Sequence, residues 1–335
     1  MKAILLKETH PDIQTAIECL EVVEKPVPEP GPGQVLIRVE AAPCNPSDLL
    51  FLQGKYGVRK SLPAVPGWEG AGTVVATGGG PFAWWLKGKR VAFAGQSDSD
   101  GSWAEYTVAD AKACIVLDRH VDIQQGATLI INPLTAIGMI EQAVSEGHHA
   151  LIQNAACSQV GRMMQALAKE KRLPLINIVR REEQKKELLS SGEKWVLNSS
   201  EEAFDHQLLK MAEELEATLL FDAVGGDQTG ETLSLLPNGS KALVYGALSE
   251  KPCGKISPLS LIFEKKSVEG FWLTSWIEKN STWHLVRSTR HIQKLMTTRN
   301  FQTKIRANVS FEKWKSALLD YQSEMTLGKV ILTNK

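Results

Sequence analysis

The feature that most constrains the fold is an alternation of apolar and helical segments over residues 127–275. Short runs rich in Val, Ile and Leu predict strands at 149–154, 174–179, 194–197, 218–222, 241–246 and 267–273. Segments with apolar residues at helical spacing, such as SQVGRMMQALAKEKR, separate these runs. Since helices supply the long crossovers that parallel strands need, this region predicts an α/β fold with a doubly wound parallel sheet.

The flanking regions predict a second, β-rich domain. Stretches such as PGWEGAGTVVATGGG, GKRVAFAGQ and GSWAEYTVAD combine strand patterns with Gly-rich turns, which is typical of a barrel-like antiparallel domain. A helix is expected at 283–298, followed by a last strand, GKVILTNK, that rejoins this domain. The predicted division is a catalytic domain of residues 1–126 and 276–335 and a dinucleotide-binding domain of residues 127–275.

The segment LIQNAACSQVGRMMQALAKE has the rhythm of a strand, a loop of small residues and a helix. Ala156, Ser158 and Gly161 stand where a dinucleotide-binding loop usually reads G-x-G-x-x-G. Gly161 keeps the position that lets the helix pack closely on the sheet, and helix amides bind phosphate whatever the side chains. The segment is thus either a dinucleotide-binding loop or an ordinary tight strand–helix turn.

The second expected strand ends in IVRREEQ, where a dinucleotide-binding fold reads the adenosine ribose. An acidic residue there binds the free 2′-hydroxyl of NAD, whereas Arg180 and Arg181 suit the extra phosphate of NADP. The alternative is a solvated helix start, which the helix dipole disfavours for arginine. The expected cofactor is therefore NADPH.

Composition excludes several other classes of protein. Lys+Arg and Asp+Glu both number 38, so a general basic surface for nucleic acid is not expected. No apolar run reaches the ~20 residues needed to span a bilayer, and no membrane partner is expected. The five cysteines are scattered without a C-x-x-C pair, which favours a reducing compartment. The apolar run among the first residues is too short for a signal peptide, so a cytoplasmic protein is expected.

Several stretches in order along the chain, AAPCNPSDLLFLQGKYG, LPAVPGWEGAGTV, INPLTAIGM, NAACSQVGRMMQALAK, FDAVGG and GKVIL, resemble the medium-chain dehydrogenase/reductase superfamily. Within it, the chain resembles the zinc-free branch that includes quinone oxidoreductases and 2-enoyl thioester reductases, and the stretch LIFEKKSVEGFWLTSW is most similar to the enoyl reductases. The resemblance implies a Rossmann-type domain and a GroES-like catalytic domain. It also implies that hydride passes from NADPH to an activated C=C bond, as in an enone or enoyl thioester, or to a quinone.

The positions that match the zinc ligands of the family carry other residues here. Asn45 matches the first cysteine, Trp68 the histidine, and the third position falls near Asn132 and Pro133, while Cys44 lies one place off. Asn and Trp are not adequate zinc ligands, so a zinc-independent reaction is expected. A zinc alcohol dehydrogenase is the disfavoured alternative.

The resemblance assigns roles to individual residues. Tyr56 matches the proton donor of the enoyl reductases, and its alternative is a packing residue at a turn. Trp272 is expected to line the substrate pocket, and its alternative is an ordinary core residue at the end of a strand. Asn45 is expected near the reacting groups. The residues expected to bind the cofactor are Asn45, Thr135, Ser158, Gln159, Val160, Gly161, Arg180, Arg181, Tyr245, Gly246, Phe271, Trp272, Leu273 and Lys329.

Three further expectations concern the whole chain. The small-molecule reductase is the first hypothesis, and a non-catalytic NADP(H)-binding sensor or structural relative is the second. The apolar stretch VEGFWLTSW at the last strand of the parallel sheet predicts a homodimer. Trp84 and Trp85 have no implied role and are expected to pack in the interior.

Overall fold

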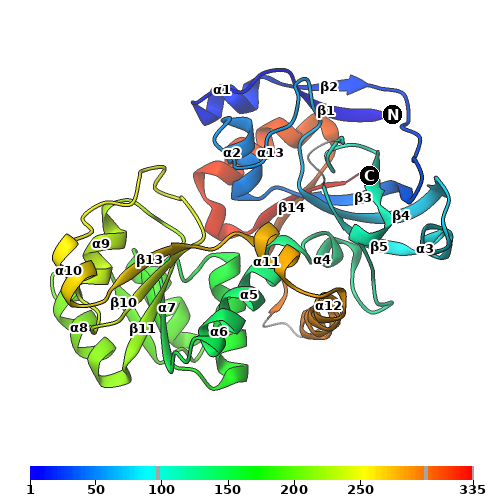
Figure 1. Cartoon of the computed structure of the whole chain (residues 1–335). Coiled ribbons are helices and arrows are strands. Elements are labelled where there is room, and N and C mark those ends of the chain that lie inside the picture. Colours follow the sequence, from blue (N-terminus) through cyan, green and yellow to red (C-terminus); the bar gives the residue numbers. More distant parts are fainter. Residues whose placement is uncertain (96–98, 298–300, 334–335) are drawn as a thin grey trace. The chain divides into compact units, whose positions relative to one another are not determined.

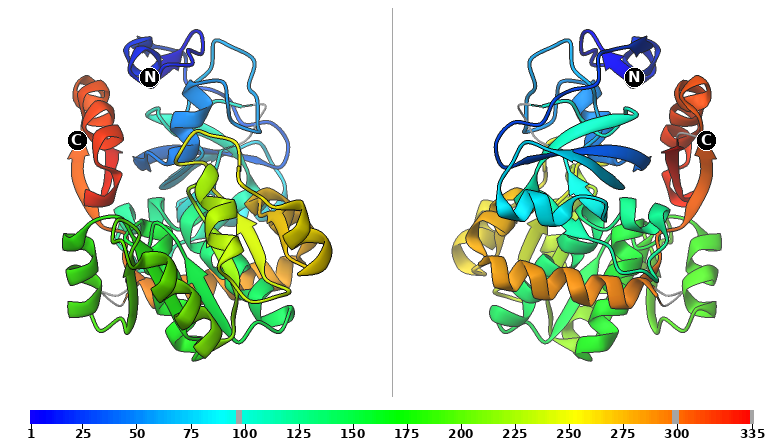
Figure 2. Two further views of the ribbon diagram at one scale, coloured as in Figure 1. Left: turned by 90° about the vertical axis from the view of Figure 1, so that its left-hand side faces the viewer. Right: turned by 90° about the vertical axis from the view of Figure 1, so that its right-hand side faces the viewer.

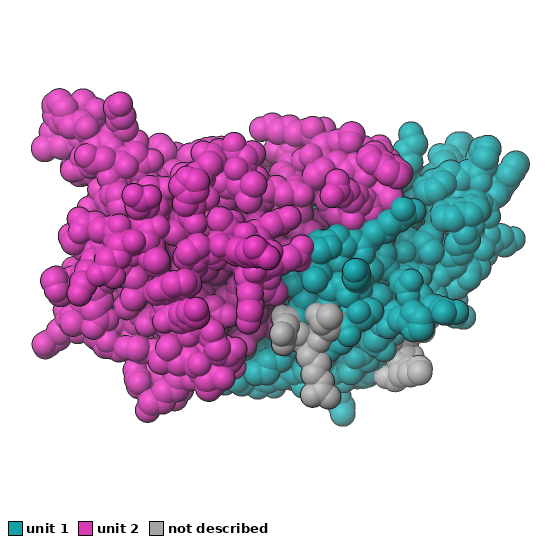
Figure 3. Space-filling view, turned by 90° about the horizontal axis from the view of Figure 1, so that it is seen from below, with its two compact units in different colours: residues 1–131, 289–335 teal, residues 132–288 magenta. Residues whose placement is uncertain are grey.

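The structure is a computed structural model that describes residues 1–95, 99–297 and 301–333. It divides into two compact units, residues 1–131 with 289–335 (unit 1) and residues 132–288 (unit 2), which Figure 3 colours separately. The sequence alone placed the second boundary near residue 276. The boundary between the compact units falls later, between residues 288 and 289, which lies within α12 (Thr282–Met296).

Unit 2 contains a six-stranded sheet in which every pairing is parallel. Its strands, in spatial order, are β10 (Trp195–Asn198), β9 (Leu175–Val179), β8 (Ala150–Gln153), β11 (Ala217–Asp222), β12 (Lys241–Val244) and β13 (Ser267–Gly270). The helices of this region are α5 (Ile131–Ser145), α6 (Gln159–Lys171), α7 (Glu182–Ser190), α8 (Phe204–Leu215), α9 (Asp227–Ser234), α10 (Pro258–Phe263) and α11 (Leu273–Lys279). Figures 1 and 2 show helices on both faces of this sheet.

The predicted doubly wound parallel sheet is therefore confirmed. All residues of β8 and β9 are buried, as strands covered on both faces require. Ile152, Ile176 and Leu220 from three neighbouring strands form a core with Leu208 of α8. This burial on both faces explains why the predicted strands read as continuous apolar runs.

Unit 1 is built mainly of antiparallel strands. Its larger sheet has the order β14 (Ile305–Val309), β15 (Lys329–Thr333), β3 (Gln34–Pro43), β4 (Glu69–Thr77), β5 (Arg90–Ala94) and β7 (Cys114–Val116), with β6 (Tyr106–Asp110) paired to β3. A separate hairpin is formed by β1 (Lys2–Leu6) and β2 (Leu20–Glu24). The helices are α1 (Ile13–Glu18), α2 (Pro46–Leu52), α3 (Pro81–Leu86), α4 (Ile123–Ala127) and α13 (Phe311–Ser323).

The predicted return of the last strand to the β-rich unit is confirmed. β15 pairs with β3, almost 300 residues earlier in the chain, and with β14. A buried pair, Trp103 and Trp314, joins the two parts of the unit edge to face, with ring centroids 4.9 Å apart. Within the part of the chain that the structure describes, no helix is both long and apolar enough to cross a membrane.

Candidate active site

In unit 2, the strand order reverses between β8 and β11. The chain passes from β8 to β9 on one side, and β11 occupies the other side. In doubly wound sheets, ligands bind at the carboxyl ends of the strands at such a switch point. Asn154 and Asp222 stand at these two ends, where the Asn154 amide donates to the Asp222 carboxylate over 2.6 Å. The Asn154 amide oxygen accepts from the Ala223 N–H over 2.7 Å, so this pair ties the two loops together.

The loop between β8 and α6 has the geometry of a helix start with one strained residue. Ser158 is the N-cap of α6, and its hydroxyl accepts from the Gly161 N–H over 3.1 Å. A left-handed conformation falls on Ala155, with φ of 48°, and not on Ala156, which is fully buried. A Cβ at Gly161 would lie 2.6 Å from the Ala156 carbonyl oxygen. Any larger residue at Gly161 would therefore push the helix away from the loop.

This helix start can accept the diphosphate of a dinucleotide. The first turn of the helix includes Gln159 and Val160, and the helix dipole favours an anion there. Ala155 and Ala156 add no bulk beyond a methyl group. The substitution of two glycines therefore leaves the physical features that bind phosphate in place.

Tyr245 brings its hydroxyl to the same edge of the sheet. Its N–H donates to the Asp222 carbonyl over 2.9 Å, which fixes it directly after β12. Its hydroxyl oxygen is buried and lies beside the side chain of Ser158. Burial raises the pKa of Tyr245, and the nearby Asp222 carboxylate adds to the rise. A Cβ at Gly246 would lie 2.6 Å from the Ala223 carbonyl oxygen, so the backbone is closely packed here.

Arg180 and Arg181 follow β9 directly, and both side chains are exposed. Arg181 is the N-cap of α7, whose first turn carries Glu182 and Glu183. Within the described part of the chain, neither guanidinium forms an ion pair. An anion such as a ribose phosphate can therefore reach both groups.

The segment after β13 packs against α5. The Phe271 N–H donates to the Val244 carbonyl over 2.8 Å, and a Cβ at Gly138 of α5 would lie 2.7 Å from the Phe271 ring. Trp272 is about half exposed, whereas Leu273 is half-buried and Thr135 is buried in α5. The structure thus gathers the residues from α5 and from the end of β13 in one part of unit 2.

Unit 1 contains a buried polar cluster around Asn45, the residue that precedes α2. The Asn45 amide donates to Glu69 over 2.9 Å, and its oxygen accepts from the Lys329 ammonium. The ammonium also donates to the Cys44 carbonyl over 3.0 Å. Asp48 accepts from the Asn45 N–H over 2.7 Å, in a capping box. The side chains of Asn45, Asp48, Glu69 and Lys329 are all almost fully buried.

The charges of this cluster are shifted by burial. Desolvation raises the pKa of Asp48 to about 7 and raises the pKa of Glu69, while it lowers the pKa of Lys329. The Lys329 charge opposes the rise at both carboxyl groups. The second oxygen of Glu69 accepts from the N–H groups of Ile130 and Ile131 over 3.1 and 2.9 Å. Glu69 therefore holds Asn45 and the start of α5 at once.

Tyr56 lies in the bend after α2 and is half-buried. Its ring centroid is 5.2 Å from that of Trp68, and the backbone N–H of Trp68 donates to Asp48 over 3.1 Å. The indole N–H of Trp68 is buried without a hydrogen-bond partner among the described residues. Tyr56 is thus linked through Trp68 and Asp48 to the cluster around Asn45.

The positions that matched zinc ligands carry no ligand set in the structure. Asn45 uses both ends of its amide within the cluster, and Trp68 packs against Tyr56. In the ranges 1–95, 99–297 and 301–333, no group of three or more His, Cys, Asp and Glu side chains could hold a metal ion.

Four buried residues of these two regions were not singled out from the sequence: Asp48, Glu69, Asn154 and Asp222. The spacing of Asn45 and Asp48 is that of a capping box, which could have indicated Asp48. Asp222 stands at the end of an apolar strand before Gly-rich residues, which could have marked the switch point. Glu69 carries no comparable local signal, because its partners lie 24 to 62 residues away.

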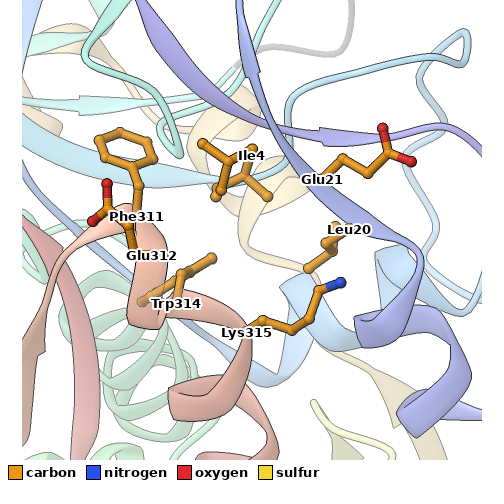
Figure 4. Close-up of a pocket in the computed structure, with 8 residues that line it drawn as sticks. Ile4, Leu20, Glu21, Phe311, Glu312, Trp314 and Lys315 are labelled. Carbon is orange, nitrogen blue, oxygen red and sulfur yellow. The ribbon is translucent and has the colours of Figure 1, made fainter.

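Unit 1 also contains a separate pocket of about 400 Å³ between the β1–β2 hairpin and α13 (Figure 4). Its walls are formed by Ile4, Leu20, Glu21, Val22, Phe311, Glu312, Trp314 and Lys315. The charged groups at its rim are already paired: Glu312 with Lys2 at 2.9 Å and Glu21 with Lys7 at 2.7 Å. Lys315 donates to the Glu18 carbonyl over 2.7 Å. None of the residues predicted for the active site lines this pocket.

Two family models match the chain. Residues 31–119 match the alcohol dehydrogenase GroES-like domain, and residues 159–288 match the zinc-binding dehydrogenase domain. Together they fall on the antiparallel strands of unit 1 and on the parallel sheet of unit 2. This pair of domains is that of the nicotinamide-dependent medium-chain dehydrogenases and reductases.

Individual relatives narrow the class. Mitochondrial enoyl-[acyl-carrier-protein] reductases of Arabidopsis thaliana and Caenorhabditis elegans are 31% and 32% identical, over 82% of this chain and 73% and 80% of theirs. A structure described as a candidate NADPH:quinone reductase from Mesorhizobium loti is 36% identical, with a TM-score of 0.90 over 99% of this chain and 98% of that one. The chain belongs to the medium-chain dehydrogenase/reductase family, in the group of enoyl and quinone reductases, and it is an oxidoreductase.

Proposed function

We propose that this chain is an NADPH-dependent reductase that transfers hydride to an activated C=C bond or a quinone without zinc. The observation that carries the proposal is Asn45, which stands where zinc members hold their first ligand and whose buried amide is hydrogen-bonded at both ends, to Glu69 and Lys329. An amide held in this way is not a zinc ligand, so a reaction in this place must polarise its substrate through hydrogen-bond donors and not through a metal. The names of the relatives, enoyl and quinone reductases, support the same class of substrate.

The residues that would hold NADPH are those at the carboxyl edge of the unit 2 sheet. The start of α6 with Ser158 would bind the diphosphate, the Tyr245 hydroxyl beside Ser158 would hydrogen-bond the cofactor, and Arg180 and Arg181 would bind the ribose phosphate. When bound, NADPH supplies the hydride. Thr135, Phe271, Trp272 and Leu273 remain candidates for the nicotinamide side.

In unit 1, the chain's own residues would handle the proton. Hydride addition to an enone or enoyl thioester leaves an enolate, which needs one proton to give the saturated product. Tyr56 is the candidate donor, since it lies half-buried beside Trp68 in the unit that contains Asn45. Lys329 and Glu69 would keep the Asn45 amide in one orientation.

The substitution Tyr56→Phe tests this role. It should lower kcat with an enone or enoyl thioester by about 10²–10⁴-fold, while the KM for NADPH stays the same, because the ring is kept and the acid is lost. Quinone reduction should fall less, since a reduced quinone oxygen can take its proton from water. Tyr106→Phe, at a half-buried tyrosine of the same unit, is the matched control. A kcat within about threefold of wild type on every alkene would remove Tyr56 from the mechanism.

Two measurements separate this proposal from its alternatives. Stoichiometric NADPH consumption with 9,10-phenanthrenequinone or an enoyl thioester distinguishes an enzyme from a non-catalytic NADP(H)-binding relative. Metal analysis of protein purified without chelator should find no zinc in stoichiometric amount, and activity should survive dialysis against EDTA. Loss of activity that zinc restores would overturn the zinc-independent mechanism.

We also propose that the chain forms a homodimer through the edge of the unit 2 sheet. Its scattered cysteines support a second proposal, that the protein is cytoplasmic. β13 is the edge strand, and all four of its residues are exposed. The preceding helix α10 exposes Leu259, Ile262 and Phe263 by 63, 65 and 74%. An open edge strand, together with the exposed apolar side chains of α10, favours pairing with a second copy. Light scattering should give a mass of about twice 36.8 kDa for wild type. The double substitution Ile262→Asp with Phe263→Asp should reduce this mass to that of a monomer. A wild-type monomer at micromolar concentration contradicts the proposal.

A further inference from the structure

Helix α3 of unit 1 displays aromatic side chains to solvent. Phe82, Trp84 and Trp85 are 46, 64 and 53% exposed, although Trp84 and Trp85 were expected to pack in the interior. That expectation is wrong because Ala83 and Leu86 are the two residues of the helix that face the core, and both are buried. Phe82 stacks on Trp85 with ring centroids 5.5 Å apart, so the aromatic groups form one patch.

Basic residues surround this patch. The Lys89 ammonium lies 3.1 Å from the centroid of the Trp85 ring, and Lys87 follows the helix directly. A third lysine, Lys112, comes from the short helix η1 (Ala111–Ala113), which contacts α3. The sequence from residue 70 to residue 97 contains no Asp or Glu. Asp110, which flanks η1, is an acidic side chain near the patch, and it accepts from Gln34 over 3.5 Å.

We propose that this α3 face, formed by Phe82, Trp84, Trp85, Lys87 and Lys89, binds the surface of a bilayer that contains anionic phospholipid. Trp and Phe rings prefer the boundary between headgroups and acyl chains, where one end of the ring is apolar and the other is wet. Lysines beside them complement the negative headgroups and keep their ammonium groups in water. The contact is peripheral, so it does not require a spanning segment.

The size of the patch argues against a second copy of the chain as its occupant. Exposed fractions of 46, 64 and 53% of side chains of about 150–250 Å² each amount to roughly 250–400 Å². A stable protein interface buries about 800 Å² on each partner. Three aromatic rings on a six-residue helix supply at most half of this area, whereas they can insert as a group into a headgroup layer.

Vesicle flotation of the full-length protein tests the proposal. The probes are vesicles of phosphatidylcholine alone and vesicles of phosphatidylcholine with about 30% phosphatidylglycerol. Both are used at low ionic strength, where surface charges are least screened. The variants are Trp84→Ser with Trp85→Ser, and Lys87→Glu with Lys89→Glu. Trp283→Ser is the matched control, because Trp283 is 73% exposed but lies in unit 2. Circular dichroism and NADPH oxidation establish that each variant is folded.

Wild-type protein and Trp283→Ser should float with the anionic vesicles, and added salt should release them. The tryptophan pair should weaken partitioning at least about tenfold, and the lysine pair should do so on anionic vesicles in particular. Three results overturn the proposal: no flotation of wild type, equal flotation of all variants, or an oligomer in light scattering that Trp84→Ser with Trp85→Ser dissociates. The last result would assign the patch to a protein contact.

Discussion

The double substitution Arg180→Ala with Arg181→Ala tests the cofactor choice of the enzyme. Both guanidinium groups follow β9, are exposed and form no ion pair within the described residues. Each charged hydrogen bond to a ribose phosphate contributes about 1.5–3 kcal/mol. Because both groups are open to solvent, the lower end of that range applies, and the pair should contribute about 3 kcal/mol. This corresponds to roughly 100-fold in affinity, and a tenfold loss is the smallest effect consistent with the assignment.

The assay compares the Kd of NADPH and NADH for wild type, the double variant and Arg172→Ala. Arg172 is an exposed arginine at the end of α6 and serves as the matched control. NADPH binding should weaken in the double variant alone, and NADH binding should hardly change, since NADH lacks the phosphate. Added salt should weaken NADPH binding to wild type more than to the double variant. An equal loss for both cofactors would refute the reasoning.

Four further predictions concern stability, measured as urea midpoints. Ala155→Gly should stabilise the chain by about 0.5–1 kcal/mol, because glycine adopts the left-handed conformation without the strain of alanine. Gly161→Ala should destabilise the chain by about 1–3 kcal/mol through overpacking. A urea midpoint equal to that of wild type in both variants would contradict both predictions. The raised pKa of Asp48, about 7, means that the folded chain keeps a proton that the unfolded chain loses, so the stability of wild type relative to Asp48→Asn should fall as pH rises from about 4 to about 7. Lys329→Met should cost about 3–5 kcal/mol at pH 8 and less at pH 5, where Asp48 is protonated; a loss that does not depend on pH would show that the ammonium does not compensate this carboxyl group.

The sequence predicted the parallel sheet well because buried strands leave a strong signal. Each of the six predicted segments contains or overlaps a strand of the sheet, and their order along the chain is correct. A strand that is buried on both faces must be apolar throughout, and turn residues must separate it from the next helix. The same signal places Ser158 and Gly161 at the start of α6.

The polar cluster and the aromatic patch could not be predicted in the same way. Lys329 meets Asn45 across 284 residues of sequence, and neither residue carries a local pattern that names the other. Trp84 looks like a core residue by composition, and its exposure depends on which face of a six-residue helix meets the sheet. Such features depend on tertiary packing, which overrides residue preference at single positions.

The position of β15 in the middle of a sheet has a consequence for synthesis on the ribosome. β15 pairs with β14 on one side and with β3 on the other, whereas all of unit 2 lies earlier in the chain. A nascent chain can therefore complete its parallel sheet while the antiparallel sheet still lacks an inner strand. Until Lys329 emerges, the buried carboxyl groups of Asp48 and Glu69 have no ammonium to compensate them. Unit 1 is thus the part of the chain that must wait for β15, and a ribosome stalled before residue 329 would leave an open edge in its sheet.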